Sequence, residues 1–365
     1  MMIRKFLRRW SRKLHRFLGL VLGIPFALIC ISGALLAFEP QLLRLVHPEH
    51  YRVDVAVRHE RLPVDEVYAR VSSQLPDTVQ LGTLRIGQPD ETWQIEIASL
   101  RNAELFVNPY TGKITGMQDH DRGFFYEVRR LHRWFFDTYD RKSDALCWGK
   151  LAVGVVSLLS LPLLLFGLYL WFPPLWRSWK LRVHICFRHG LRRALYDVHV
   201  TGGFHTVLLL LVLALTGLTW SFPWYRQAFY ATFGVVYGAA EPSGPQPVTD
   251  YRVWQRALKQ VEARHPDYRW IEVSPTEIRF STTRYGNARR ADVYHYEAPS
   301  GRLTRFIPYR QTSAQQRVRG WIVTLHEGLW LGWFSQLLTC LGALVGACLP
   351  FTAYYLYCKR RYRHR

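Results

Sequence analysis

The chain has 365 residues, of which 49% are hydrophobic and 15% aromatic, and this length could hold two or three ordinary domains. Its 48 Lys and Arg residues outnumber its 27 Asp and Glu residues, which gives a formal net charge of +21 at pH 7. Three short segments beside apolar runs contain basic residues with almost no acidic ones. The charge therefore indicates a membrane surface as partner, and no nucleic acid.

Four long apolar segments alternate with polar regions along the chain. Each is near or above the ~17–25 residues that a helix needs to cross a bilayer core, and none contains Lys, Arg, Asp or Glu. The third segment is the shortest, and we expect Gly202, Gly203 and Phe204 to extend it. We therefore predict four transmembrane helices, over Phe17–Phe38, Leu151–Phe172, Thr206–Phe222 and Leu337–Cys358.

The basic segments predict the orientation of these helices. One precedes the first span, one joins the second and third spans, and one follows the fourth span. Short loops rich in Lys and Arg stay in the cytoplasm. Both termini are therefore expected inside, and the two long polar regions outside.

The two outer regions have similar local patterns, which predict a small α+β domain in each. Each region contains one amphipathic helix, alternating strands and a turn rich in Pro and Gly. In the first region the helix is expected over Leu62–Leu75, the strands over Thr92–Ile97 and Ala103–Val107, and the turn over Asn108–Lys113. In the second region the helix is expected over Tyr251–Val261, the strands over Ile271–Val273, Glu277–Ser281 and Val293–Glu297, and the turn over Ala298–Arg302.

Histidines mark a duplicated pattern. His15 opens the first span and His199 opens the third, and each is followed 18 residues later by a glycine, Gly33 or Gly217, that comes after Ser or Thr. Each outer region then leads to a further Leu-His pair, at His132 and at His326. The chain therefore reads as two repeated units of span, α+β domain, histidine motif and span.

In their order and spacing these motifs resemble the PepSY-associated transmembrane family. The motifs are Leu14-His15-Arg16-Phe17-Leu18-Gly19, Leu131-His132-Arg133-Trp134, Asp197-Val198-His199, Leu215-Thr216-Gly217 and Leu325-His326, and the resemblance covers essentially the whole chain. That family includes ferric-siderophore reductases of the bacterial inner membrane that carry b-type haem. The resemblance implies two haems, an inner-membrane location and two extracytoplasmic PepSY-like domains. It divides the chain into a basic N-terminus with the first span (1–38), domain 1 (39–130), a histidine motif with the second span (131–172), a basic cytoplasmic loop (173–198), the third span (199–222), domain 2 (223–320), a histidine motif with the fourth span (321–358) and a basic cytoplasmic tail (359–365).

The expected haem ligands are His15, His199, His132 and His326. Imidazole is a usual axial ligand of haem iron, and the predicted topology places one pair at each membrane face, His15 with His199 and His132 with His326. His205 is an alternative to His199 as the ligand. Histidines near a membrane interface also serve as plain amphipathic anchors. Ser32-Gly33 and Thr216-Gly217 let a helix or a flat cofactor approach closely, and ordinary helix packing explains them equally well.

Several other histidines fit no site pattern. His47 and His50, in His-Pro-Glu-His, and His59 could bind a metal transiently, although no spacing supports a site. His184 and His189 lie among arginines of the inner loop, where we expect them to be solvated. No Gly-x-Gly-x-x-Gly fingerprint and no phosphate-binding loop occur in the sequence. A nucleotide site is therefore not expected, and electrons would come from a quinol or a separate reductase.

We expect an enzyme without catalytic residues separate from the haem: an oxidoreductase that passes electrons across the membrane to an extracytoplasmic ferric siderophore or other ferric chelate in iron uptake. Two further hypotheses remain open. PepSY domains also suggest a non-enzymatic membrane regulator or sensor of extracytoplasmic proteolysis. A permease for iron chelates is the third, although the spans lack the ionisable residues expected along a polar path.

Overall fold

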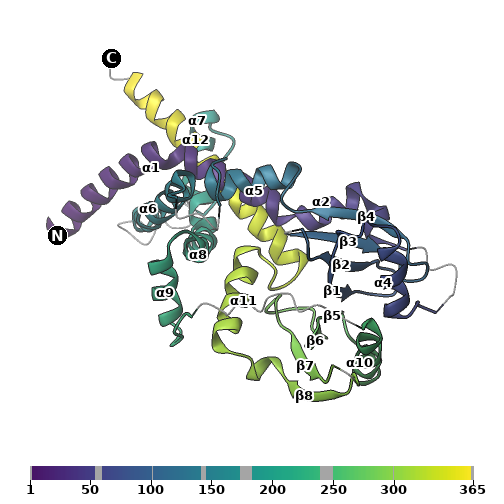
Figure 1. Cartoon of the computed structure of the whole chain (residues 1–365). Coiled ribbons are helices and arrows are strands. Elements are labelled where there is room, and N and C mark those ends of the chain that lie inside the picture. The colour runs from purple at the N-terminus through teal and green to yellow at the C-terminus, as the bar shows by residue number, and fades with distance from the viewer. Residues whose placement is uncertain are drawn as a thin grey trace. The chain divides into compact units, whose positions relative to one another are not determined.

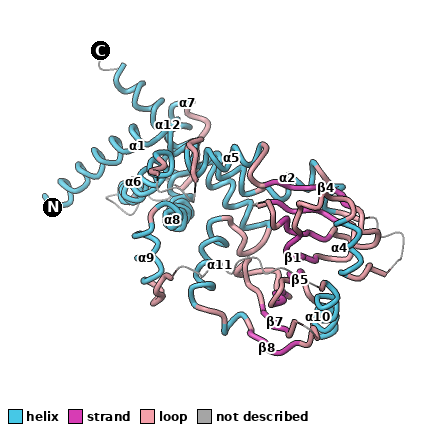
Figure 2. Tube along the Cα trace, in the orientation of Figure 1, coloured by secondary structure: helices cyan, strands magenta, loops and turns pink. Residues whose placement is uncertain are grey.

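The computed structural model describes residues 2–53, 60–100, 102–140, 145–172, 183–238, 250–298 and 300–362. The chain forms two compact units, each built from segments far apart in the sequence. The helical unit comprises Met1–Phe38, Glu127–Tyr237 and Ile322–Arg365, and the sheet unit comprises Glu39–Tyr126 and Gly238–Trp321. Figures 1 and 2 show that the strands belong to the sheet unit.

The long helices of the helical unit confirm the four predicted spans. Within the described residues, four helices are long and apolar enough to cross a membrane. They are α1 (Met2–Ala37), α6 (Trp148–Trp171), α8 (Gly203–Ser221) and α12 (Trp333–Tyr362). The third is lengthened at its start, as expected, because α7 (Leu191–Asp197) and the π-helical turn η3 (Val198–Gly202) run into α8, so that Leu191–Ser221 is one continuous helix.

Small residues let the four spans pack closely. α1 packs against α6 and α12, and α8 packs against the same two helices, which closes a four-helix bundle. A Cβ atom at Gly23 would lie 2.6 Å from the hydroxyl of Tyr354, and one at Gly342 would lie 2.3 Å from Leu209. Such close approach is how helices associate in lipid, where apolar side chains gain little by leaving the solvent. The buried centre is formed by Ala27, Cys30, Leu164, Val207, Leu210 and Ala347.

Five shorter helices and one 3₁₀ turn join the spans to the sheet. α2 (Glu39–Val46) and α3 (Pro48–Tyr51) follow the first span, and α9 (Pro223–Ala231) follows the third. α5 (Phe124–Trp134), η4 (Tyr309–Gln311) and α11 (Ala314–His326) follow the strands, and the C-terminal ends of α5 and α11 carry His132 and His326.

The two polar regions share one sheet of eight antiparallel strands. The strands are β1 (Leu81–Ile86), β2 (Trp93–Ile97), β3 (Ala103–Val107), β4 (Ile114–Asp119), β5 (Trp270–Val273), β6 (Glu277–Ser281), β7 (Asp292–Tyr296) and β8 (Leu303–Ile307). Their order is β4-β3-β2-β1-β5-β6-β7-β8, so each region supplies one half. The halves meet at β1 and β5, where Leu84 pairs with Val273 and Ile86 with Ile271.

Two helices cover one face of this sheet. α4 (Val64–Ser72) and α10 (Tyr251–Arg264) pack against each other and against the alternate side chains of the strands. Tyr68 and Trp254 are fully buried there, and Tyr68 stacks on Tyr251 with ring centroids 3.9 Å apart. The opposite face is covered at β3 and β4 by α3, whose Tyr51 packs on Phe106. Phe106 is completely buried on this face, whereas its neighbours Leu105 and Val107 belong to the core beneath α4 and α10.

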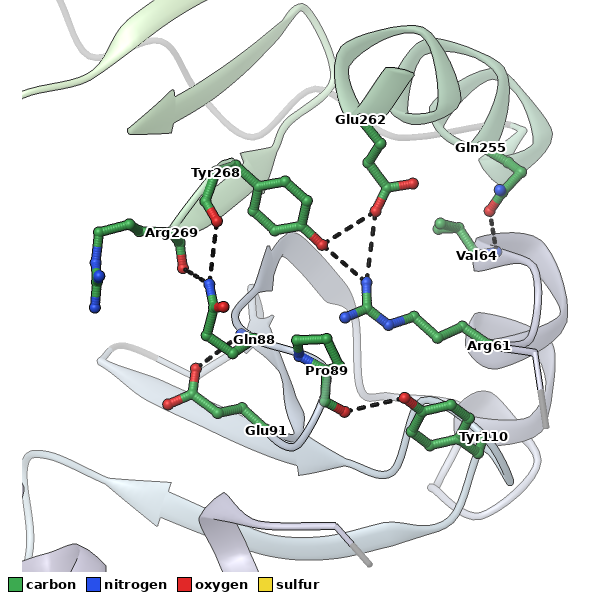
Figure 3. A network of polar contacts seen from close by, with 10 residues as sticks. All are labelled: Arg61, Val64, Gln88, Pro89, Glu91, Tyr110, Gln255, Glu262, Tyr268 and Arg269. Carbon is green, nitrogen blue, oxygen red and sulfur yellow. Dashed lines mark hydrogen bonds and ion pairs between the residues drawn. The ribbon is translucent and has the colours of Figure 1, made fainter. Parts of the chain in front are cut away.

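Polar contacts fasten the two halves beside the β1–β5 seam, as Figure 3 shows. Arg61 donates to the Tyr268 hydroxyl at 2.9 Å and pairs with Glu262 at 3.5 Å. The side chain of Gln88 donates to the carbonyls of Tyr268 and Arg269, both at 3.1 Å. Burial raises the pKa of Tyr268 above its ordinary value, so this hydroxyl remains protonated and able to donate to Glu262.

Candidate cofactor site

The structure brings the four motif histidines together in two pairs. His15 of α1 lies against His199 of η3, with ring centroids 6.2 Å apart and ring planes at 78°. His132 of α5 lies against His326 of α11, with ring centroids 6.1 Å apart and ring planes at 59°. All four rings are half-buried in the helical unit. These are the pairs that the sequence predicted, and their role as ligands stays a prediction.

His205 lies outside both pairs. Its side chain is exposed, and its Nδ1 lies 2.8 Å from the carbonyl oxygen of Thr201 in the same helix. His199 lies within the π-helical turn Val198–Gly202, where the helix is locally widened. Such turns are common at functional sites because they change the direction of a side chain relative to a regular helix. Of the two candidates on this span, the structure places His199 beside His15.

Each of the four rings is tied to a backbone carbonyl of another helix. Nδ1 of His15 lies 3.0 Å from the oxygen of Leu163 on α6, and Nδ1 of His199 lies 3.1 Å from that of Leu349 on α12. Nδ1 of His132 lies 3.0 Å from the oxygen of Ile29 on α1. His326 bonds in the same way to the carbonyl of Leu213 on α8. Each span therefore anchors one histidine.

A hydroxyl reinforces three of these anchors. Oγ of Ser32 lies 3.2 Å from Nδ1 of His132, Oγ1 of Thr216 lies 3.0 Å from Nδ1 of His326, and Oγ1 of Thr352 lies 2.9 Å from Nδ1 of His199. Each hydroxyl stands three residues after the anchoring carbonyl, and each donates its own proton to a backbone carbonyl of its helix, at 2.6 to 2.7 Å. His15 has no such hydroxyl, because Phe166 stands at the corresponding position.

These contacts determine which ring nitrogen carries the proton. A carbonyl oxygen can only accept, and a hydroxyl whose proton is already donated can also only accept from the ring. Nδ1 must therefore be an N–H donor in each histidine, and the neutral ring then has its lone pair on Nε2. A metal-bound histidine is normally held in this way, with its other nitrogen donating to a carbonyl or carboxylate.

Glycines make room for three of the rings. A Cβ atom on Gly33 would lie 3.0 Å from Cε1 of His132, one on Gly167 3.0 Å from Cε1 of His15, and one on Gly217 3.1 Å from Cε1 of His326. Each glycine stands four residues after the anchoring carbonyl, one helical turn along the same face. The fourth position, facing His199, is Ala353.

The ring separations fit ligation of one metal ion by both members of a pair. Metal–imidazole bonds of about 2 Å on opposite sides of an ion put the two ring centroids roughly 6 Å apart. The observed centroid distances of 6.2 and 6.1 Å agree with this separation. Neutral rings with free Nε2 lone pairs suit the axial positions of haem iron. The residues present therefore fit two bis-histidine haems.

Several anchoring residues are not evident in the sequence. Ser32-Gly33 and Thr216-Gly217 stand out there, and the structure shows that both contact a motif histidine. Leu163, Gly167 and Leu349 act through a backbone carbonyl or a missing side chain, so their residue types give no signal. Thr352 was detectable only as a hydroxyl within the fourth apolar span.

The remaining histidines lie elsewhere. His47 and His50 come together with Glu49 in the sheet unit, with one ligand atom of each within 4.8 Å of the others. Nδ1 of His189 lies 3.1 Å from Sγ of Cys186, whose backbone N–H donates to the buried Asp197. His184 is exposed in the same loop, and His59 lies outside the described residues.

A bundle of four apolar spans with two anchored histidine pairs between its helices, joined in one chain to an antiparallel sheet, defines an integral membrane protein. The family model of the PepSY-associated TM region matches residues 12–360, and the chain belongs to this family. No curated protein matches the chain.

Proposed function

We propose that the protein is a haem-containing reductase of the bacterial inner membrane that passes electrons outward to an extracytoplasmic ferric chelate. The anchoring of the two histidine pairs carries this proposal. A histidine that serves only as an interfacial anchor does not need its Nδ1 fixed by a carbonyl of a second helix, with its ring about 6 Å from that of another histidine. Here all four motif histidines share that anchoring.

The proposed ligand roles follow from the chain's own geometry. His15 and His199 would hold one b-type haem, and His132 and His326 would hold the other. When bound, each haem supplies the reversible one-electron chemistry of its iron. The carbonyls, hydroxyls and glycines of the four spans keep the ring orientations and leave the Nε2 atoms free for the iron.

The two pairs are spaced along the bundle. Ile29, which anchors His132, lies 14 residues after His15 on α1, and Leu213, which anchors His326, lies 14 residues after His199. At a helical rise of 1.5 Å per residue this is about 21 Å, which is most of a hydrocarbon core of ~30 Å. One pair would therefore receive electrons near the cytoplasmic face, and the other would release them near the outer face.

The same intervals support a two-unit repeat as part of the proposal. In each sequence repeat, the histidine that opens the first or third span is followed after 14 residues by an anchoring carbonyl, after 17 by a hydroxyl and after 18 by a glycine. In each sequence repeat, a helix is then followed by four antiparallel strands: α4 precedes β1–β4, and α10 precedes β5–β8. We assign these two α+β halves as PepSY-like and extracytoplasmic, with both termini in the cytoplasm.

Exposed arginines support an anionic substrate. Arg284 and Arg289 are exposed in the loop between β6 and β7, and Arg305 is exposed on β8. Positive side chains attract anions over several ångströms, so these arginines suit a ferric chelate that carries negative charge, such as a catecholate. Reduction of the hard Fe(III) ion to Fe(II) weakens its binding by oxygen ligands and so releases the iron. The electron would come from a quinol or from a separate cytoplasmic reductase.

Visible spectroscopy of the purified full-length protein tests the cofactor. A strong Soret band with α and β bands on reduction, and two haems per chain by pyridine haemochrome assay, are the expected results. A colourless, fully folded protein would refute the reductase and would instead favour the membrane regulator.

Single-turnover reoxidation tests the substrate class. The protein is reduced without oxygen in a membrane mimetic, mixed with a ferric hydroxamate or catecholate and a ferrous trap, and followed by haem absorbance and Fe(II) formation. Matching rates of haem oxidation and Fe(II) appearance are expected. Haem that reoxidises only with quinones would assign the protein to another electron pathway.

A further inference from the structure

A second cluster of metal-ligating side chains lies in the sheet unit, within the sequence His47-Pro48-Glu49-His50. Nδ1 of His47 lies 3.3 Å from Oε1 of Glu49, and Nε2 of His50 lies 3.7 Å from the same oxygen. The two imidazole rings are stacked, with centroids 4.9 Å apart and planes at 9°. Three donor atoms of the types that bind transition metals therefore face one small volume.

The sheet holds His50 in this position. Its ring stacks on Phe106 of β3 with centroids 5.7 Å apart. It also occupies the space above Gly116 of β4, where a Cβ atom would lie 2.1 Å from Cδ2 of His50. The carbonyl of His50 accepts a hydrogen bond from the Thr92 hydroxyl at 2.7 Å. One ligand of the cluster is therefore fixed before any ion arrives, which reduces the entropy cost of binding.

Hydrogen bonding within the protein does not explain the cluster. Nδ1 of His50 is buried and has no hydrogen-bond partner among the described residues. Since this nitrogen is buried, Nε2, which lies 3.7 Å from Oε1 of Glu49, is the ring atom of His50 that an ion can reach. The neighbouring cation Arg44 pairs with Glu91 at 3.0 Å, and the ion-pair partners of Glu49 among the described residues are His47 and His50.

We propose that His47, Glu49 and His50 form a binding site for a divalent first-row transition-metal ion, separate from the histidine pairs of the helical unit. Metal–ligand bonds of about 2.0–2.2 Å separate neighbouring ligand atoms by roughly 3–3.5 Å, close to the spacing seen here. Two imidazoles with one carboxylate favour Zn(II), Fe(II) and similar ions over Mg(II) or Ca(II), which require oxygen ligands. Three protein ligands leave further coordination positions open, so the site suits transient capture and release of an ion.

The site belongs to one half of the chain only. At the interval that separates His15 from His199, the positions that correspond to His47, Glu49 and His50 are Ala231, Phe233 and Gly234, none of which offers a metal-binding side chain. The ligands are therefore not explained by the pattern shared between the two halves. The inference does not depend on haem binding or on reduction of a chelate.

Zinc binding to the full-length protein in a membrane mimetic tests the proposal. Metal-stripped protein is titrated with Zn(II) in competition with a chromophoric chelator at pH 7.5. Glu49→Gln is the central variant, because this side chain is 59% exposed and can be changed without disturbing the packing. We expect Glu49→Gln, His47→Gln and His50→Gln each to weaken one zinc site at least tenfold, and zinc K-edge absorption of the wild type to show imidazole ligands.

His120→Gln is the matched control. His120 Nε2 lies 3.4 Å from Oε1 of Glu104, so it is a comparable histidine–carboxylate pair without the third ligand. Zinc affinity should be unchanged in this variant, and haem content should be unchanged in all four. Equal zinc stoichiometry and affinity in wild type and Glu49→Gln, or an equal loss in His120→Gln, would overturn the proposal.

Discussion

Oγ1 of Thr216 and Nδ1 of His326 lie 3.0 Å apart although 110 residues separate them in the chain. Thr216 also donates its hydroxyl proton to the carbonyl of Val212 at 2.7 Å, so its oxygen accepts the proton of the imidazole. Ser32 and His132, 100 residues apart, repeat this contact at the other histidine of the pair. The hydroxyls of α1 and α8 thus orient the imidazole rings of His132 on α5 and His326 on α11.

Thr216→Val should weaken the ligand role of His326 and leave the bundle folded. The substitution removes the second acceptor of Nδ1–H, while the carbonyl of Leu213 remains. Loss of a group that hydrogen-bonds a metal ligand typically lowers metal affinity by about 10–100-fold, and we expect about tenfold for haem here because one acceptor is kept. Haem retention on dilution and the midpoint potential measure the effect. Thr219→Val is the control, because the Thr219 hydroxyl donates to its own helix at Thr216. Identical retention and potential in the two variants would contradict this role.

Replacing one histidine should remove one haem and spare the other. His15→Ala or His199→Ala should lose the haem of the inner pair, and His132→Ala or His326→Ala that of the outer pair, so each variant keeps about half of the haem. His205→Ala is the matched control and should keep all of it, because its ring is exposed and bonded to its own helix. Full haem content in all four single variants would refute the assignment.

Gly167→Ala should disturb His15 without changing the polarity of the site. The new Cβ atom would lie 3.0 Å from Cε1 of the ring, so the imidazole must shift by a few tenths of an ångström. We expect a changed low-spin haem spectrum and a shifted potential for the inner haem alone. Gly203→Ala is a suitable comparison, since its Cβ would meet Leu349 at an ordinary 3.8 Å. Two indistinguishable spectra would show that this ring is not closely held.

Reporter insertions test the membrane orientation. Gly190 and Gly286 both have positive φ, 79° and 90°, and a Cβ at either would meet nothing within 4 Å, so these turns should accept an insertion. A reporter at Gly190 or after Arg365 should be active only in the cytoplasm, and one at Gly286 only outside. Activity of the C-terminal reporter outside the cell would reverse the assignment of histidine pairs to membrane faces.

Arg61→Gln should destabilise the seam between the two halves of the sheet. The substitution removes the guanidinium donor of the Tyr268 hydroxyl oxygen and the cation paired with Glu262, which keeps only its bond from Tyr268, so about 1–3 kcal/mol of stability is expected to be lost. Thermal unfolding of the full-length protein measures this. Arg122→Gln should have little effect, since its pair with Asp119 is 87% exposed on the arginine side. An unchanged melting temperature for Arg61→Gln would show that the Arg61 contacts do not stabilise the seam.

The spans and histidine pairs were predictable because their signals are local. An apolar run identifies a span by its length, and the interval from His15 to Gly33 recurs from His199 to Gly217. The anchors of His15 and His199 were not predictable, since Leu163 and Leu349 contribute backbone oxygens that every residue possesses. The π-helical turn at His199 likewise has no signature in Val198–Gly202.

The predicted strands were found at β2, β3, β5, β6 and β7, whereas β1, β4 and β8 were missed. β4 and β8 are the edges of the sheet and bury few side chains, so they lack the alternation that marks a half-buried strand. β1 contains Gly82 and only its later residues are buried. Its partner β5 lies far along the chain, which is why two separate domains were expected where one sheet is shared.

The pairing of β1 with β5 sets an order for assembly. β1 is synthesised before the second and third spans, and β5 after them, so the first half of the sheet emerges without its central neighbour. Until β5 arrives, β1 is an open edge that can pair with strands of other chains. Such long-range pairing is also slow to form. A chain truncated after the third span should therefore aggregate through β1. In the full chain, both halves of the sheet must reach the same side of the membrane before β1 and β5 can pair and cover each other's edges.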